Sequence, residues 1–322
     1  MHSRDPVLET WKPRRGQETV MLRWLISYWC NYACRYCPQD HGRDTKYGEN
    51  AAHAFDNQPV EIWLDAFARH FSERNLVMTI TGGEPMLDRR SMPVLLKKLT
   101  SCENVRIIRI DTNASWNPKF YSEVDKSKIR LMCTFHPGQT SEEAFAASIE
   151  RLQHSGFVIG MINYVMTRES IPEYERQQRR FVRLGIPVNP NPLWDSNGQY
   201  ASEDLDLMRE YLPSDFDYEF RTQQRSPKGQ RCRFPAIAYE LNHWGMIWVG
   251  CHYNNRGSFF AKQLPRRFRR SAVCPHASCV CLDKYSFVSD SDRNTNTNTL
   301  DAYGRLLLEK QKGDQVVSLD AS

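Results

Sequence analysis

The chain has 322 residues, of which 40% are hydrophobic and 25% charged, with a formal net charge of +5. This composition is typical of an ordinary globular protein, the length suits one large α/β domain with an appendage or two domains, and the charge is too small to demand nucleic acid as a partner. Because no apolar stretch is long enough for a membrane span and residues 1–6 lack a signal peptide's apolar core, we expect a cytoplasmic protein without a membrane partner.

From residue 21 onward, strand-like and helix-like segments alternate. Strands are expected at 21–29, 76–81, 105–110, 129–135, 157–166 and 186–189. Helices are expected after Pro59, from Ser91, near 117–126, from the capping box Thr140 to Glu143, and from the capping box Ser170 to Glu173. Such alternation predicts parallel strands joined by right-handed crossover helices. We therefore predict an α/β fold with a partial (βα)6 barrel.

The chain is expected to divide into five parts. They are an arm at 1–19, the barrel core at 20–200, a bridge at 201–231 with one helix at 202–211, a small cysteine-rich domain at 232–290, and a tail at 291–322. The cysteine-rich part shows little strand or helix periodicity, so we expect it to be irregular. The tail is low in complexity, with a terminal helix near 300–312.

Ten cysteines in a chain without a secretion signal are better explained by metal binding than by disulfides, because the cytosol keeps thiols reduced. Two of them, Cys102 and Cys133, are isolated and are expected to be ordinary buried thiols. The other eight fall into an early set of three and a late set of five.

The early set, Cys30, Cys34 and Cys37, lies on one loop directly after the first predicted strand. Three thiolates on a short loop can bind three irons of a cube and leave the fourth iron open for another ligand. The alternative is a zinc knuckle, but a closed zinc site needs four ligands, and the nearest candidate for a fourth is His41.

Further polar residues follow the predicted strands. Residues 82–85 come after the second strand, Asn113 after the third and His136 after the fourth. Since the carboxyl ends of parallel strands meet at one edge, we expect these residues to converge on the cysteine loop.

The cysteine spacing and the Gly82-Gly83-Glu84-Pro85 turn resemble the radical S-adenosylmethionine superfamily. The resemblance implies a [4Fe-4S] cluster whose open iron binds S-adenosylmethionine, and reductive cleavage of that cosubstrate to a 5′-deoxyadenosyl radical. It also implies an electron donor such as flavodoxin or ferredoxin.

The same resemblance implies roles for individual residues in cosubstrate binding. The turn from Gly82 to Pro85 would contact the methionine amino group, with Glu84 balancing its charge, and Tyr36 would pack on the adenine. Asn113 would approach the ribose, and the less clearly matched polar positions are His136 and Asn163. For Asn113 and His136 an ordinary loop role stays open.

The late set is Cys232, Cys251, Cys274, Cys279 and Cys281. It resembles the SPASM domain, or its shortened form the twitch domain, and implies one auxiliary [4Fe-4S] cluster on four of the five thiols. A structural zinc site with the same ligands is the alternative, because four thiolates suit either metal.

The expected function is hydrogen abstraction from a small polar metabolite, such as an aminosugar, cyclitol, nucleotide or amino acid derivative, followed by oxidation, rearrangement or epimerisation. A ribosomally made peptide is the first alternative. A nucleic-acid base is another, suggested by the basic runs 12–15 and 265–270. From a different class comes a non-catalytic iron-sulfur or zinc module. The sequence names no catalytic acid or base.

Overall fold

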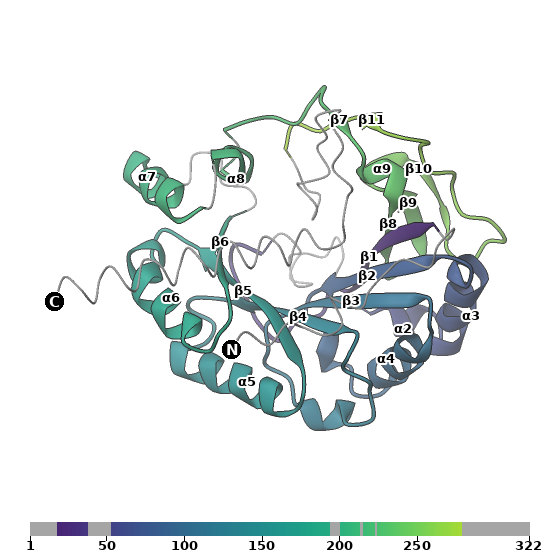
Figure 1. Cartoon of the computed structure of the whole chain (residues 1–322), viewed down its shortest axis with the longest axis horizontal. Helices are drawn as coiled ribbons and strands as arrows, with labels where there is room; N and C mark the ends of the chain where they lie inside the picture. Colours follow the sequence, from purple (N-terminus) through teal and green to yellow (C-terminus); the bar gives the residue numbers. More distant parts are fainter. Residues whose placement is uncertain (1–17, 38–52, 194–199, 213–214, 223, 279–322) are drawn as a thin grey trace.

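The computed structural model describes residues 18–37, 53–193, 200–212, 215–222 and 224–278. Six strands follow one another in chain order, and each neighbouring pair is parallel. They are β1 (Thr19–Ser27), β2 (Asn75–Gly82), β3 (Val105–Thr112), β4 (Ile129–Phe135), β5 (Val158–Met166) and β6 (Val188–Pro192). Figure 1 shows them arranged in an arc. The predicted α/β partial barrel is confirmed.

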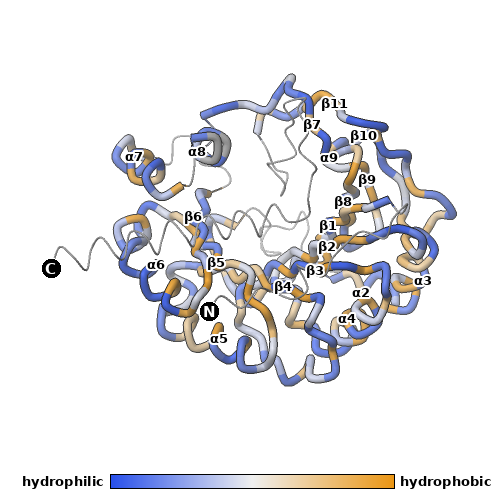
Figure 2. The backbone as a smooth tube through the Cα atoms, in the orientation of Figure 1, coloured by the Kyte–Doolittle hydropathy of each residue, from blue (hydrophilic) through white to orange (hydrophobic). Residues whose placement is uncertain are grey.

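Helices cover the outer side of this arc (Figure 1). They are α2 (Ala54–Asn57), α3 (Val60–Phe71), α4 (Ser91–Ser101), α5 (Glu142–His154) and α6 (Tyr174–Val182). Trp24 of β1 packs against Trp63 and Phe67 of α3, with ring centroids 4.7 and 5.3 Å apart. Figure 2 shows hydrophobic residues along the strands and on the helix sides that face them. The main core therefore lies between the sheet and the helices.

The crossover between β3 and β4 differs from the prediction. The helix expected near 117–126 is wrong, because this segment forms only the 3-10 helix η3 (Pro118–Tyr121). The Tyr121 hydroxyl lies 2.8 Å from the carbonyl of Met86 and 3.0 Å from that of Asp88, so η3 is tied to the turn after β2. These tertiary hydrogen bonds stabilise a short 3-10 turn in the segment where the sequence predicted a longer helix.

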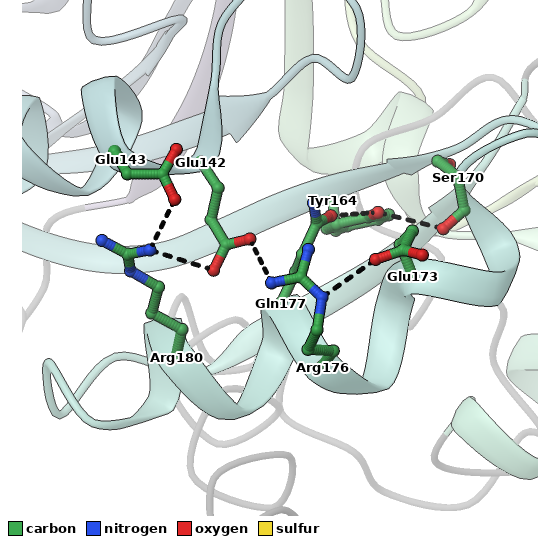
Figure 3. A network of polar contacts seen from close by, with 8 residues as sticks. All are labelled: Glu142, Glu143, Tyr164, Ser170, Glu173, Arg176, Gln177 and Arg180. Carbon is green, nitrogen blue, oxygen red and sulfur yellow. Dashed lines mark hydrogen bonds and ion pairs between the residues drawn. The ribbon is translucent and has the colours of Figure 1, made fainter.

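The first predicted capping box is also wrong. Helix α5 is capped by Ser141, whose Oγ accepts a hydrogen bond from the backbone N–H of Ala144, and not by Thr140. Glu143 pairs instead with Arg180 of α6 at 2.9 Å (Figure 3). The Glu143 carboxylate, which the sequence pattern assigned to the helix cap, therefore pairs with Arg180 of another helix.

The second predicted capping box, at Ser170, does not form either. The Ser170 hydroxyl accepts from the N–H of Thr167, and Glu173 binds Arg176 at 2.9 Å (Figure 3). These residues belong to the 3-10 helix η4 (Ile171–Glu173), which precedes α6. Arg176 also bonds the buried Glu142 of α5 at 2.8 Å, so this polar network ties α6 to α5.

The chain after β6 continues the same sheet. Strand β8 (Ala238–Asn242) pairs in parallel with β1, and β9 (Met246–Val249) and β10 (His252–Ser258) follow in antiparallel pairing. The order across the sheet is β10-β9-β8-β1-β2-β3-β4-β5-β6. These three strands lie in the part expected to be irregular, and the sequence analysis did not predict them.

The remaining described elements are short. They are the 3-10 helix η2 (Pro85–Leu87), α7 (Ser202–Tyr211), α8 (Asp215–Arg221), α9 (Phe234–Ile237) and a separate two-stranded sheet of β7 (Arg231–Cys232) and β11 (Ala272–Val273). The bounds of α7 agree with the predicted helix at 202–211. Much of the chain between β10 and β11 is hydrophilic (Figure 2). The basic run there is not entirely a solvated surface, because Arg267 donates to the carbonyl of Ala236 and pairs with Glu18.

Several predictions fall outside the described residues. They concern the basic run 12–15, His41, Cys279, Cys281 and the tail 291–322. In the part of the chain that is described, no helix is both long enough and apolar enough to cross a membrane.

Candidate functional site

The cysteine loop begins three residues after β1, at the carboxyl edge of the sheet. Cys30, Cys34 and Cys37 form no disulfide within the described residues, and Cys34 is buried. The backbone N–H of Cys37 donates to the carbonyl of Cys34 at 3.2 Å, which closes a turn. Because β1 has parallel neighbours on both sides, the loop begins beside the ends of β2 and β8.

The turn after β2 lies directly against the base of this loop. Gly83 donates its N–H to the carbonyl of Ser27, and Glu84 donates its N–H to the carbonyl of Trp29, both at 2.8 Å. A Cβ atom on Gly83 would lie 2.0 Å from the Trp29 oxygen, and one on Gly82 would lie 2.2 Å from the Ser27 oxygen. Only glycine permits this close approach, so the pair of glycines joins the turn to the cysteine loop.

The Glu84 carboxylate points into the protein. Its oxygens accept hydrogen bonds from the Thr112 hydroxyl at 2.8 and 2.9 Å, from the Asn113 N–H at 2.6 Å and from the Met86 N–H at 3.1 Å. The side chain is 1% exposed. In this structure Glu84 therefore fastens the turn after β2 to the end of β3, and its predicted contact with a cosubstrate cation stays a prediction.

Residues that follow β3 reach the cysteine loop. The Asn113 side-chain N–H donates to Asn31 Oδ1 at 3.0 Å, and the same nitrogen lies 3.7 Å from the Cys30 sulfur. Asn31 in turn donates to the Ser115 hydroxyl at 3.0 Å. The end of β3 thus holds the first turn of the loop on the side facing Cys30.

The turn after β4 contacts the middle of the loop. His136 Nδ1 lies 3.5 Å from the Cys34 sulfur and 3.1 Å from the Tyr36 hydroxyl, and its ring stacks on the Tyr36 ring at an interplanar angle of 8°. The Gln139 side-chain oxygen accepts from the N–H of Ala33 at 2.8 Å. Three successive strand ends therefore hold one loop, as the shared edge predicts.

Asn163 is the one predicted residue that the described contacts place elsewhere. Its Oδ1 accepts from the Asn189 side chain of β6 at 2.7 Å, and Asn189 accepts from Arg221 of α8 at 2.7 Å. This chain of polar contacts ties the end of the arc to α8. It leads away from the cysteine loop, so the cosubstrate role of Asn163 stays a prediction.

Burial and neighbouring acidic groups disfavour negative charge on the cysteine loop. The pKa of the Cys30 thiol is raised to about 11, mainly by burial, and the nearby Glu84, Cys34 and Cys37 raise it further. Three thiolates and a carboxylate this close together repel one another unless a metal centre offsets their charge. The donor set therefore fits an iron-sulfur cluster.

The described residues contain no group of three or more His, Cys, Asp or Glu placed to hold a single metal ion. A cube differs from such a site because each of its thiolates binds a different iron. Three thiols spread along one loop suit that arrangement.

Three of the late cysteines are described, and all three are buried. Cys232 of β7 pairs with Ala272 of β11, and Cys274 lies two residues further along. In an antiparallel pair, this diagonal position is on the same face. The carbonyl of Cys251 lies 2.8 Å from His276 Nε2, which follows Cys274 by two residues. These contacts connect the three chain segments that carry Cys232, Cys251 and Cys274.

The sequence analysis missed four residues of the site: Asn31, Thr112, Ser115 and Gln139. Each follows or ends a strand at the carboxyl edge or belongs to the cysteine loop, and that position was a usable signal. Their partners were not visible, because the loop bends back onto strand ends 82 to 106 residues away in the chain.

The buried Glu84 predicts a pH dependence of stability. Burial raises the pKa of this carboxyl to about 7, from a usual value of 4.5. Because the folded state binds the proton more tightly, the stabilisation is full below pH 4.5 and is lost as the pH rises through 7. Urea titrations should show a fall of about 3 kcal/mol in unfolding free energy across this window. This slope should be absent in Glu84→Gln, and an equal slope in both proteins would contradict the assignment.

No family model matches the chain. A segment of 103 residues is 31% identical to the GTP 3′,8-cyclase of Xanthomonas campestris pv. campestris strain B100, and it is 32% identical to that of Xanthomonas axonopodis pv. citri. Each alignment covers 32% of this chain and 29% of the relative. The match thus spans less than a third of the length of these relatives.

Two solved structures share the fold. The histidine-tagged form of anSMEcpe with bound AdoMet has a TM-score of 0.53 and 14% identity, and the match covers 76% of this chain and 75% of that one. Native anSMEcpe with bound AdoMet has a TM-score of 0.50 and 12% identity, with 71% and 74% covered. These matches show that the chain shares the partial-barrel fold of these proteins.

Proposed function

We propose that this protein is a radical S-adenosylmethionine enzyme. The observation that carries the proposal is the cysteine loop, which is held at the carboxyl edge of a partial barrel by the ends of β2, β3 and β4. In this proposal Cys30, Cys34 and Cys37 hold a [4Fe-4S] cluster. The cluster, once bound and reduced, would supply the electron that cleaves S-adenosylmethionine.

The residues around the loop would position the cosubstrate. The glycines at 82 and 83 let this turn pack against the backbone of Ser27 and Trp29, and Glu84 keeps the turn fixed to the end of β3. Asn113 lies beside the Cys30 sulfur and His136 beside the Cys34 sulfur. The resemblance implies that these two residues and Tyr36 contact the adenosine. A fixed turn and loop hold the reacting groups in place without further reorganisation.

The substrate that we propose is a small polar metabolite, from which a hydrogen atom is abstracted. The GTP 3′,8-cyclase segment favours a nucleotide within this class. A peptide substrate is the second candidate, because native anSMEcpe with bound AdoMet and the Cp18Cys peptide also shares the fold, at a TM-score of 0.50 and 14% identity. Modification of a nucleic-acid base and a non-catalytic metal module are the other candidates, and the next test separates the metal module from an enzyme.

Production of 5′-deoxyadenosine tests the proposal. The anaerobically reconstituted protein should release it from S-adenosylmethionine when dithionite supplies electrons in place of a flavodoxin or ferredoxin donor. Chromatography of the quenched reaction measures the product. If the reconstituted protein binds iron but releases no 5′-deoxyadenosine, it is a non-catalytic module and the proposal fails.

We also propose that the late cysteines hold one auxiliary [4Fe-4S] cluster in a SPASM-like or twitch-like unit. The support is the burial of Cys232, Cys251 and Cys274. Among the described residues, Cys232 shares a small hydrophobic cluster with two other buried residues, Phe234 and Ala238, whereas the neighbouring strands β8 and β9 pack into the main core. So small a core suggests a metal-stapled segment. A fourth ligand would come from Cys279 or Cys281.

The iron content checks this second cluster. Wild-type protein should bind about eight irons per chain, and Cys232→Ala with Cys251→Ala should leave about four. The double variant should still cleave S-adenosylmethionine, because the barrel holds that site. Zinc in the late site after strictly anaerobic preparation would favour the structural alternative.

A further inference from the structure

The imidazole of His136 is held in one orientation by two tyrosines of the cysteine loop. Tyr36 stacks on it with ring centroids 6.1 Å apart, and Tyr32 meets it edge-on at 5.8 Å and 82°. The ring therefore lies between two aromatic side chains of the loop. Its Nδ1 atom faces the sulfur of Cys34 at 3.5 Å.

The Cys34 sulfur has a second polar neighbour close by. The Tyr36 hydroxyl lies 3.1 Å from the same His136 Nδ1 and also forms a hydrogen bond with Cys34. A thiolate bound to iron can only accept hydrogen bonds, so His136 can bond it only as the tautomer that carries its hydrogen on Nδ1.

We propose that His136 acts through Cys34, as a positioning residue that raises the reduction potential of the cluster proposed above. Reduction adds one electron to the cluster, and the iron–thiolate bonds stay intact. The negative charge on the cluster and its thiolates therefore increases by one. An N–H donor stabilises this more negative state further, and hydrogen bonds to the sulfurs are among the features that set such potentials. The inference rests on the proposed cluster, but it assigns His136 to the thiolate where the resemblance assigned it to adenosine.

The two roles predict different results when S-adenosylmethionine is absent. A residue that only contacts adenosine leaves the potential of the free cluster unchanged and weakens cosubstrate binding. A residue that donates to Cys34 changes the potential before any cosubstrate is added. A redox titration of the reconstituted full-length protein without cosubstrate, followed by electron paramagnetic resonance, therefore separates them.

His136→Leu should lower the ratio of reduced to oxidised cluster about tenfold at a fixed potential, which is a shift of about 59 mV for one electron. His136→Asn places a side-chain N–H near the position of Nδ1 and should recover most of the difference. His154→Leu, on the exposed end of α5, is the matched control and should titrate like wild type. The signal belongs to the first cluster if it is missing when Cys30, Cys34 and Cys37 are all alanine.

An unchanged titration of His136→Leu, with weaker binding of S-adenosylmethionine, would overturn the inference and restore the adenosine role. If His136→Leu binds no iron, His136→Phe provides the comparison, because it keeps an aromatic ring beside the two tyrosines and removes Nδ1. It should also lower the ratio about tenfold, and an unchanged ratio would refute the inference. Absence of any signal from reconstituted wild type would instead refute the proposed function.

Discussion

Replacing Cys30, Cys34 and Cys37 together with alanine is expected to abolish the release of 5′-deoxyadenosine. These thiols are the ligands that the carboxyl edge of the barrel presents on one loop, and without them no iron is held beside the turn after β2. Chromatographic detection of 5′-deoxyadenosine should fall to the level of the protein-free control. The loss of about half of the bound iron should accompany it.

Cys102→Ala is the matched control for the loss of a thiol. This cysteine ends α4, and its sulfur bonds to the Lys98 carbonyl within its own helix end, at 3.3 Å. The variant should keep its iron and its activity. If the triple variant releases 5′-deoxyadenosine at the wild-type rate, the cysteine loop does not hold the cluster that cleaves S-adenosylmethionine.

Gly83→Ala is expected to disrupt the site from a position that binds no metal. The added methyl group would meet the Trp29 carbonyl oxygen at 2.0 Å, so the turn after β2 must move away from the loop. The move breaks the two backbone hydrogen bonds to Ser27 and Trp29 and disturbs the contact between Glu84 and β3. We expect a loss of at least about 2 kcal/mol in unfolding free energy, together with poor cluster retention.

Gly257→Ala provides the comparison for this steric effect. A methyl group there would meet only the Pro265 ring at 3.5 Å, an ordinary contact. Urea titration and iron analysis of the two variants should therefore differ sharply. If Gly83→Ala matches Gly257→Ala in both measurements, the close packing of turn and loop is not needed for the site.

The parallel strands β1 to β5 were predictable because each is rich in apolar residues. The prediction for β6 was poorer, since the strand expected at 186–189 shares only Val188 and Asn189 with β6 (Val188–Pro192). The strand β4 agrees with the prediction at both ends, Ile129 and Phe135. The strands β8 to β10 were not predictable in the same way, since β8 is only five residues long and its parallel partner β1 is more than 200 positions away. The two predicted capping boxes did not form, because Glu143 and Glu173 pair with arginines of α6 instead of with the helix N-termini.

The meeting of the cysteine loop, the glycine turn, Asn113 and His136 followed from one rule about parallel strands. The rule places residues at an edge, but it does not orient their side chains. Glu84 illustrates the limit, since its carboxylate could face a cosubstrate or the interior, and three hydrogen-bond donors from Met86, Thr112 and Asn113 hold it inside. The predicted contacts of Tyr36, Asn163 and the late cysteines with cofactors remain predictions.

The parallel pairing of β8 with β1 has a consequence for how the chain folds. Arg23 and Glu240, which form an ion pair across these strands, are 217 positions apart in the sequence. During synthesis the strand that ends at the cysteine loop therefore leaves one edge without its neighbour until nearly three quarters of the chain has been made. An uncovered strand edge is a template for pairing with other chains, and contacts so distant in sequence form slowly. A fragment ending near residue 200 should consequently aggregate, and late addition of β8 would make completion of the sheet the step that protects the growing chain.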